Sequence, residues 1–295
     1  MITNATHDSS MTLDQTSPKT SSALTVQLSF KRYEIKYLIS DAQRERLMAV
    51  MASHMVPDEY GPSTVCNIYY DTPSNLLVRR SIEGGTYKEK VRTRSYGVAH
   101  PGDPVFLELK KKAEGIVYKR RATLSPERAE ALLAGHGDPT TQIERELDFS
   151  IRRYGGLLPM TFLAYDREAF YAADDHDFRM TFDRRLRYRT HDVSLTADDH
   201  GDLLMREDQS ILEVKTAKAI PLWLVQFLSA EGLRKVSFSK IGRAYQRECE
   251  LAARRLPAPA AAVEPASVPE RVPVSVPAYT PRHLEPIHGW RTAVA

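Results

Sequence analysis

Cysteine is scarce in this sequence: Cys66 and Cys249 are the only two among 295 residues. Two cysteines so far apart predict no disulfide framework and fit a reducing compartment. Long apolar runs are absent too, because the longest, residues 220–228, is too short to span a bilayer and contains Gln226. Residues 1–23 are rich in Ser and Thr and lack the apolar core of a signal peptide. We therefore expect a soluble, cytoplasmic protein with no transmembrane segment of its own.

A strong net charge is also missing. The 41 Lys and Arg residues nearly balance the 38 Asp and Glu residues, for a formal net charge of +3. Bulk charge therefore gives no reason to expect a protein that coats nucleic acid, and the placement of the cations matters instead. Aromatic residues do not interleave with the cations as a base-stacking platform requires, so no nucleic-acid partner is expected. The nine histidines show no metal-ligand spacing.

What the sequence does contain is a run of cations with strand periodicity, at residues 88–96 (KEKVRTRSY). Its side chains alternate between two faces of a strand, which sends Lys88, Lys90, Arg92 and Arg94 to one side. Four cations on one strand face repel one another and cannot enter an apolar core without partners. They need either open water or an anion between them.

Other segments repeat this pairing of an apolar face with a charged face. The charged faces carry Arg32, Glu34 and Lys36 in residues 30–37, Glu108 and Lys110 in 105–110, Lys119, Arg121 and Thr123 in 118–124, Tyr165 and Arg167 in 162–170, Arg179, Thr181 and Asp183 in 178–183, and Glu213 and Lys215 in 211–215. Helices are expected from a capping box at Ser40 and Gln43 to about residue 55, from Ser125 to about residue 135, and over residues 142–154, 221–232 and 239–255.

Two architectures fit this pattern, and the pattern alone leaves both open. One is a sheet with a single face in water. The other, favoured because these faces concentrate Arg and Lys rather than Ser, Thr, Asn and Gln, is an α+β fold. In it, an antiparallel β-barrel has a lumen lined by cations and helices packed on its outside. Such a lumen suits a polyanion, since Arg forks match phosphate oxygens. Its few acids, Glu34, Glu108 and Glu213, would hold a divalent metal.

Seven short motifs, each weak alone, occur in an order that resembles a known family. They are FKRYEIKY at residues 30–37, IYYD at 68–71, YKEKVRTRSYG at 87–97, LELK at 107–110, YDR at 165–167, ILEVK at 211–215 and SFSK at 237–240. Over about residues 28–250 the chain is similar to the VTC domain, the polyphosphate polymerase module of the vacuolar transporter chaperone complex. That domain is one of the CYTH-like triphosphate tunnel metalloenzymes.

The resemblance implies an antiparallel β-tunnel that binds phosphate chains and a divalent ion, usually Mn²⁺ or Mg²⁺. The polymerases of this family transfer the γ-phosphate of ATP to a growing inorganic polyphosphate chain. It further implies that Glu213 binds the metal. It implies phosphate-binding roles for Lys36, Arg92, Arg94, Lys110, Lys119, Arg167, Arg179, Ser239 and Lys240. The residues expected to be catalytic are Lys36, Arg92, Arg94, Arg167, Arg179 and Glu213. Arg32, Lys90, Arg121 and Lys215 share the charged faces and are expected to bind phosphate as well. One further family arginine falls at Arg79 or Arg80, with Arg80 preferred.

Two departures from the family pattern bear on activity. Ser237 stands where the eukaryotic polymerases carry a lysine, so one phosphate contact is weakened or missing. Hydrolytic tunnel enzymes begin with Glu-x-Glu-x-Lys, whereas this chain has Arg32, Glu34 and Lys36, which favours chain binding over triphosphate hydrolysis. A metal-dependent triphosphate or polyphosphate hydrolase stays open, and so does a non-catalytic module that senses polyphosphate or inositol phosphates.

Composition divides the chain into three parts. Residues 1–24 and the Pro/Ala-rich residues 256–295 are expected to be disordered, and residues 25–255 to form the tunnel domain. ATP and polyphosphate are the expected partners. A membrane-protein partner and the oligomeric state stay open.

Overall fold

The computed structural model describes residues 33–114 and 116–255, and the chain divides into two units, residues 1–251 and 252–295. The first unit holds every strand described below. Arg32 and the two segments predicted to be disordered, residues 1–24 and 256–295, lie outside the described residues. The role of Arg32 and the disorder of these segments therefore stay predictions.

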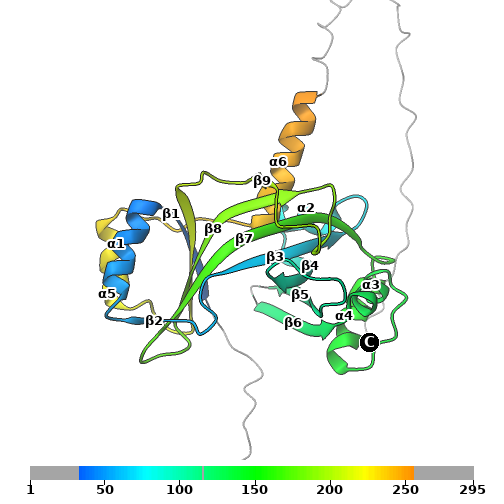
Figure 1. Ribbon diagram of the computed structural model, residues 1–295, viewed down its shortest axis with the longest axis horizontal. Coiled ribbons are helices and arrows are strands. Elements are labelled where there is room, and N and C mark those ends of the chain that lie inside the picture. Colours follow the sequence, from blue (N-terminus) through cyan, green and yellow to red (C-terminus); the bar gives the residue numbers. More distant parts are fainter. Residues whose placement is uncertain (1–32, 115, 256–295) are drawn as a thin grey trace, which may run out of the picture. The chain divides into compact units, whose positions relative to one another are not determined.

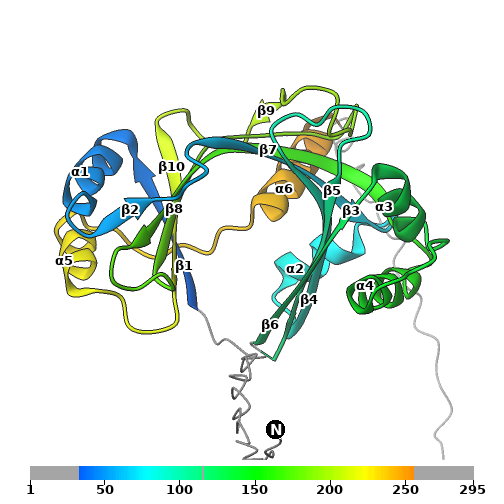
Figure 2. The same ribbon diagram turned by 60° about the horizontal axis from the view of Figure 1, so that its bottom comes forward.

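Ten strands form one antiparallel sheet (Figures 1 and 2). They are β1 (Tyr33–Ser40), β2 (Met55–Pro57), β3 (Ser63–Asp71), β4 (Tyr87–Tyr96), β5 (Val105–Ala113), β6 (Ile116–Leu124), β7 (Leu158–Ala172), β8 (Arg179–Arg189), β9 (Asp202–Leu203) and β10 (Gln209–Thr216). The hydrogen-bonded order is β1-β10-β8-β7-β3-β4-β5-β6, with β2 paired to β7 and β9 paired to β8. Figure 2 shows the sheet curled into a U whose two arms end in β1 and β6.

The α+β class and the antiparallel sheet are confirmed, but the curl is not a closed barrel. Over the described ranges β1 and β6 are the ends of the pairing path and form no ladder with each other. Side chains reach across the open side instead, because Lys110 Nζ on β5 lies 3.3 Å from Glu34 Oε2 on β1. The sheet therefore encloses a groove with one concave, charged face.

Six helices accompany this sheet in the described residues: α1 (Asp41–Met51), α2 (Leu76–Glu83), α3 (Pro126–Leu133), α4 (Gln142–Arg152), α5 (Leu222–Ala230) and α6 (Lys240–Arg255). Local sequence explains where several of them begin. The Ser40 hydroxyl accepts the Gln43 N–H while the Gln43 side chain accepts the Ser40 N–H, which is the predicted capping box. Ser125 caps α3 with Pro126 in its first turn, as expected. None of the described helices is long and apolar enough to cross a membrane.

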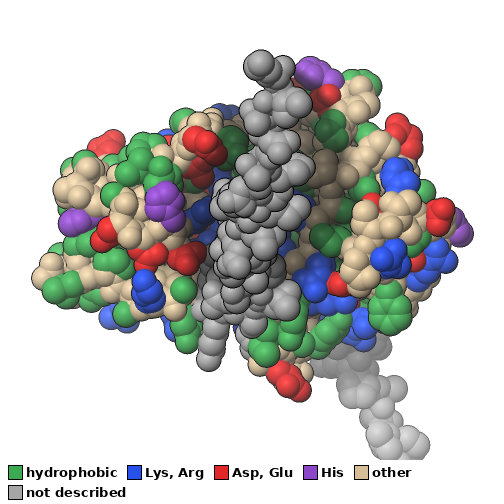
Figure 3. Space-filling view, turned by 90° about the horizontal axis from the view of Figure 1, so that it is seen from below, with side chains coloured by type: hydrophobic (Ala, Val, Ile, Leu, Met, Phe, Trp, Pro, Cys, Tyr) green, Lys and Arg blue, Asp and Glu red, His purple; other side chains and the backbone are tan. Residues whose placement is uncertain are grey.

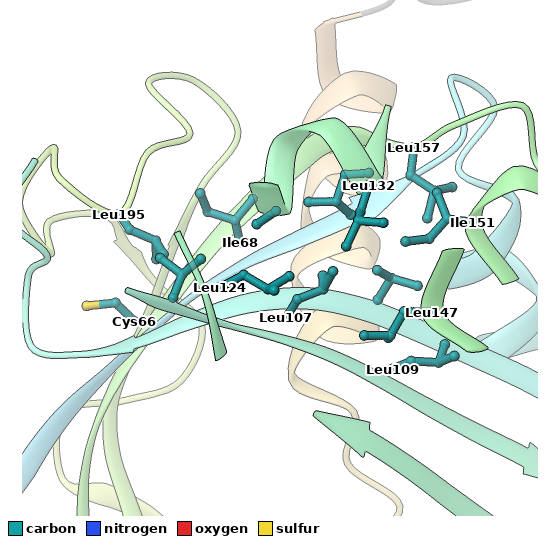
Figure 4. Packing of buried hydrophobic residues seen from close by; sticks show 14 of the residues in the cluster. Cys66, Ile68, Leu107, Leu109, Leu124, Leu132, Leu147, Ile151, Leu157 and Leu195 are labelled. Atoms are coloured by element: carbon teal, nitrogen blue, oxygen red, sulfur yellow. The ribbon is translucent and has the colours of Figure 1, made fainter. Parts of the chain in front are cut away.

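The alternation predicted from sequence places an apolar layer on the convex face. On one arm of the U, Leu107 and Leu109 of β5 pack against Leu132 of α3 and against Leu147 and Ile151 of α4 (Figure 4). On the other arm, α1 and α5 cover β1, β8 and β10. Burying these leucines stabilises the fold by roughly 1.5–3 kcal/mol each. The intervening residues of the same strands are thereby turned to the concave face.

Two helices, α2 and α6, lie on the inner side of the curl (Figure 2). Ile241 and Ala244 of α6 and Val78 of α2 pack on Tyr69, Tyr165 and other apolar residues of the concave face. Arg79 and Arg80 thus lie on a helix, which is followed by Gly84, whose φ of 89° suits glycine. This inner packing brings the first turn of α6 into the charged part of the groove.

Candidate functional site

One wall of the groove is a charged ladder across β4, β5 and β6. The register places Arg92 beside Glu108 and Glu108 beside Arg121. Arg92 Nε donates to Glu108 Oε2 at 2.7 Å, Arg121 Nε donates to Oε1 at 2.5 Å, and Lys119 Nζ lies 3.1 Å from Oε1. Glu108 is only 2% exposed. Burial would raise the pKa of Glu108, but Arg92, Arg94 and the neighbouring cations outweigh burial and hold that pKa far below its usual value.

The opposite wall centres on two buried acids, Asp183 of β8 and Glu213 of β10. Arg167 of β7 donates two hydrogen bonds to Asp183, at 2.6 and 2.7 Å. Lys240, the first residue of α6, lies 2.5 Å from Asp183 Oδ2 and 2.7 Å from Glu213 Oε1. Burial would lower the pKa of Lys240, but Asp183 and Glu213 raise it above its usual value. Lys240 is therefore a fixed cation.

Glu213 also faces the open side of the groove. Lys36 of β1 lies 3.4 Å from Glu213 and 3.1 Å from Glu34, and Lys215 lies 3.8 Å from Glu213. Burial would raise the pKa of Glu213, but Lys240, Lys36 and Arg167 hold it well below its usual value. For Glu34, burial is outweighed by Lys110 and Lys36, and its pKa falls to about 2. Both acids are thus ionised at neutral pH.

Tyr165 joins the two walls. Arg94 Nη2 of β4 lies 3.2 Å from the Tyr165 hydroxyl. The Arg167 guanidinium lies 5.0 Å from the centre of the same ring, and Lys240 Nζ lies 4.8 Å from it. Cations from three distant parts of the chain therefore meet around one aromatic ring. On the other side, Arg92 Nη1 donates to the Tyr69 hydroxyl at 3.0 Å.

The start of α6 supplies a further set of donors. Ser239 precedes the helix, and its hydroxyl accepts the Gly242 N–H at 3.1 Å and the Lys90 ammonium at 2.9 Å. The segment before α6 is held to β1, because Val236 N–H donates to the Lys36 carbonyl and Lys36 Nζ donates to the Phe238 carbonyl. A helix start offers free N–H groups and a positive dipole end to an anion. Ser237, the residue that departs from the family pattern, is exposed in this segment.

Most of the predicted site residues come together in this groove. They are Glu34, Lys36, Lys90, Arg92, Arg94, Glu108, Lys110, Lys119, Arg121, Arg167, Glu213, Lys215, Ser239 and Lys240. Two other predicted residues are exposed. Arg179, which the register pairs with Lys215, donates to the His176 carbonyl, and Arg80 lies on α2. Arg32 lies outside the described residues. Figure 3 shows a patch of Lys and Arg side chains on the face seen from below.

Sequence reasoning missed two members of the site, Asp183 and Tyr69. Asp183 is fully buried on the charged face of β8, where strand alternation alone does not distinguish a counter-charge from a solvated acid. The signal in the sequence is that Asp183 shares one strand face with Arg179 and Thr181, which indicates a position in the groove. Tyr69 lies on β3, whose one charged residue is Asp71 at its end, so no charged face along this strand indicates a groove-facing residue.

The acids of the groove are the candidate ligands for a divalent ion. Across residues 33–114 and 116–255, no group of three or more His, Cys, Asp or Glu side chains is placed to hold a metal. The expected trio of Glu34, Glu108 and Glu213 is therefore not one cluster, since Glu108 is taken up by the cations of its own wall. Glu34 and Glu213 do share Lys36. Magnesium ordinarily binds one or two carboxylates together with substrate phosphates, so this pair suits an ion that also contacts phosphate.

Comparisons with solved structures give distant likenesses. A candidate adenylate cyclase from Bacillus halodurans has 16% identity and a TM-score of 0.44, covering 70% of this chain and 92% of its own. A second candidate adenylate cyclase, from Vibrio parahaemolyticus, has 12% identity and a TM-score of 0.38, with coverage of 74% and 98%. A chain of the Schizosaccharomyces pombe Mediator head module has 10% identity and a TM-score of 0.34, with coverage of 75% and 95%. Likenesses this distant carry no argument about this chain.

Curated proteins give no match at all. A protein family does match, and it covers the whole of the charged groove and nearly all of the sheet. The match to the VTC domain runs over residues 31–248, well over half of the sequence, and this chain therefore belongs to the VTC domain family.

Proposed function

We propose that this protein is a polyphosphate polymerase, which transfers the γ-phosphate of ATP to a growing inorganic polyphosphate chain held along the concave face. The observation that carries the proposal is the convergence of Arg94, Arg167 and Lys240 on Tyr165. Asp183 and Glu213 offset part of the charge of Arg167 and Lys240, and a chain of phosphates is a ligand that would offset the remaining positive charge of the groove. Residues 25–255 would form the catalytic domain.

The reaction asks the protein for placement and charge. An oxygen of the terminal phosphate of the chain attacks the γ-phosphorus of ATP and forms the new P–O bond. The bond from that phosphorus to the β,γ-bridging oxygen breaks, and ADP leaves with the electron pair. The attacking oxygen is already anionic, so no general base is needed. What opposes the reaction is repulsion between two polyanions and the charge that develops on the transferring phosphoryl group.

The residues of the groove address both obstacles. Arg92 and Arg94 on one wall and Arg167 on the other present planar donors to non-bridging oxygens from two sides, which aligns donor and acceptor. Lys240 and the N–H groups at the start of α6 add fixed positive charge where the phosphoryl group transfers. The buried partners Glu108 and Asp183 hold these cations in place before any ligand binds.

A divalent ion, Mn²⁺ or Mg²⁺, would be held by Glu213 with Glu34 as its neighbour and, when bound, would neutralise charge on the phosphates. Lys36 bridges these two acids and would keep both oriented toward the groove. Asp183, bound by Arg167 and Lys240, would act as the counter-charge that keeps the site assembled without binding the ion itself.

The test is to incubate the purified protein with ATP and Mn²⁺ and look for long-chain polyphosphate on a gel. Polymer is expected from wild type and from Arg206→Ala, which removes an exposed arginine paired with Asp208, two residues further along the chain. Arg92→Ala should form at least tenfold less polymer. Its melting temperature should hardly change, because Glu108 keeps Arg94, Lys119 and Arg121 as partners.

Other outcomes would reassign the protein. Release of phosphate from triphosphate or short polyphosphate, with no polymer formed, would make it a hydrolase. Tight polyphosphate or inositol-phosphate binding without any turnover would make it a sensing module. Equal polymer formation by wild type and Arg92→Ala would show that the reaction does not depend on this wall of the groove.

A further inference from the structure

Beyond the arginines, the charged face of β4 and β5 continues into aromatic residues. Along β4, Arg92 and Arg94 are followed on the same face by Tyr96, and on β5 Glu108 gives way to Phe106, which the register pairs with Arg94. The Tyr96 and Phe106 rings meet edge to face, with centroids 5.7 Å apart and an interplanar angle of 73°. This aromatic pair is not evident from the sequence, because Tyr96 and Phe106 belong to different strands.

Arg121 of β6 couples these rings to the charged ladder. Its guanidinium lies 4.8 Å from the centre of the Phe106 ring, and its Nη2 lies 3.5 Å from the Tyr96 hydroxyl. Its Nε meanwhile donates to Glu108. One side chain thus contacts both rings and the acid that holds the phosphate-facing cations, so the aromatic pair and the arginines form one continuous surface.

Packing explains only part of this arrangement. Phe106 is half-buried beneath Arg121, as a core-edge phenylalanine would be. Tyr96, however, is 53% exposed although it lies on the concave face, and it meets Arg121 through its hydroxyl rather than through the face of its ring. Phe106 and Arg121 fix the orientation of the Tyr96 side chain and leave about half of it exposed. An oriented, exposed ring beside phosphate-binding groups is the arrangement used to stack a nucleobase.

The spacing suits a nucleotide. Residues two apart on a strand are separated by about 6.8 Å, so Tyr96 lies about that far along the face from Arg94. In a nucleoside triphosphate a ribose separates the base from the α-phosphate, and a ribose spans a gap of this kind. Triphosphate oxygens on Arg92 and Arg94 would therefore leave the base at Tyr96 and Phe106.

We infer that Tyr96, oriented by Phe106 and Arg121, is the stacking platform for the base of the nucleoside triphosphate that donates phosphate in this groove. The inference rests on the proposed function, because that function makes ATP the donor. Stacking uses the flat face that every base presents, so the platform would favour nucleoside triphosphates over inorganic triphosphate without selecting one base. ATP and GTP should bind with affinities within a few-fold of each other.

Binding measurements test the platform without requiring turnover. Calorimetry would compare ATP with inorganic triphosphate, in the presence of EDTA, for wild type, Tyr96→Ala, Tyr96→Trp and Tyr118→Ala. Tyr118 is the matched control, since it is an exposed tyrosine that lines a pocket with Leu109, Lys111 and Arg120 on the other face of the same sheet. Stacking on an aromatic residue is worth enough that Tyr96→Ala should weaken ATP binding by roughly 5- to 150-fold.

The expected pattern is specific. Tyr96→Ala should keep the wild-type affinity for inorganic triphosphate, while Tyr96→Trp restores ATP binding and Tyr118→Ala matches wild type for both ligands. Equal losses for ATP and triphosphate in Tyr96→Ala would make Tyr96 a packing residue, and an unchanged ATP affinity would also overturn the inference. If the protein shows the expected selectivity for ATP but makes no polymer, the stacking platform would stand and the proposed polymerase function would be wrong.

Discussion

Glu213 has two candidate roles, as a counter-charge to the phosphate-binding cations and as a ligand of a divalent ion. It is contacted by Lys240, Lys36 and Arg167, so the simplest role for it is a counter-charge. Asp183 already fills that role for Lys240 and Arg167, more deeply buried and with shorter contacts. Neutralising Lys240 and Arg167 therefore does not require Glu213. A metal ion would require it, because Glu213 and Glu34 together would supply carboxylate ligands.

Glu213→Gln keeps the shape of the side chain and removes its charge. Polymer formation should fall at least a hundredfold, and the Mn²⁺ concentration for half-maximal residual activity should rise. Polyphosphate affinity should stay the same or increase, because one negative charge leaves the groove. Titration of turnover against Mn²⁺ checks this, with Glu231→Gln, which breaks a surface pair with Arg46, as the control. An unaltered metal requirement in Glu213→Gln would return Glu213 to the role of counter-charge.

The pH dependence of anion binding is also decided by single residues. Burial lowers the pKa of Lys90 to about 8, and burial likewise lowers the pKa of Lys215 to about 8. A phosphate chain favours the protonated lysine, so binding raises these pKa values and takes up protons near pH 8. Affinity is therefore full below pH 7 and falls as the pH rises through 8 toward 9. A rise of one pKa unit at one lysine on binding would make this fall about tenfold.

Lys215→Arg provides the comparison for this prediction, because arginine stays charged throughout the range. Calorimetry with inorganic triphosphate at pH 7, 8 and 9 would measure both proteins, and any titration of the ligand itself is common to the two. The fall in affinity should be smaller for Lys215→Arg than for wild type. Identical pH profiles would show that Lys215 does not contribute.

At the scale of elements, the start of α6 combines a structural and a functional role. Ser239 caps the helix and accepts a hydrogen bond from Lys90, which lies on β4, and Lys240 follows directly. Ser125 performs the same capping for α3, on the convex side of the sheet. The two helix starts therefore allow capping to be separated from anion binding.

Ser239→Ala and Ser125→Ala should each lower the free energy of unfolding by about 1 kcal/mol, the usual cost of a lost N-cap. Only Ser239→Ala should also weaken triphosphate binding, by several-fold, because Lys90 loses its partner and the first turn of α6 loses its anchor. Chemical denaturation and calorimetry on both variants check the two parts. Equal triphosphate affinities for the two variants would reduce Ser239 to a plain cap.

The elements also show which features the sequence determines. Strand alternation assigned the charged faces of β4, β5, β6, β8 and β10, since a period of two needs only local sequence. It could not show that β3 contributes Tyr69, nor that α2 is a helix, because short and weakly patterned segments take their conformation from tertiary packing. The cap at Ser40 was predictable, whereas the end of α1 at Met51 rather than near residue 55 was not.

At the scale of the whole molecule, closure of the barrel was the expectation that local reasoning could not settle. Whether β1 and β6 pair depends on strand tilt and stagger summed around the sheet, and no single segment encodes them. The convergence of Arg94, Arg167 and Lys240 on Tyr165 is likewise a property of the whole curl. The family resemblance placed these residues in one site, whereas pattern alone leaves them on two strands and a helix that are distant in sequence.

The composition of residues 1–24 and 257–295 leads to a prediction about the whole chain. Both segments are poor in the periodic apolar residues that build a core, and the cores of the unit lie within residues 37–244. A protein comprising residues 25–256 should therefore keep the melting temperature and the polymer-forming activity of the full chain. Removal of residues 239–295 should instead abolish triphosphate binding, because Lys240 and the start of α6 go with it, and should expose Tyr69 and Tyr165 to water. Thermal melts and calorimetry on the full chain and both truncations decide the matter. Loss of the fold in residues 25–256 would show that the terminal segments contribute to the folded core.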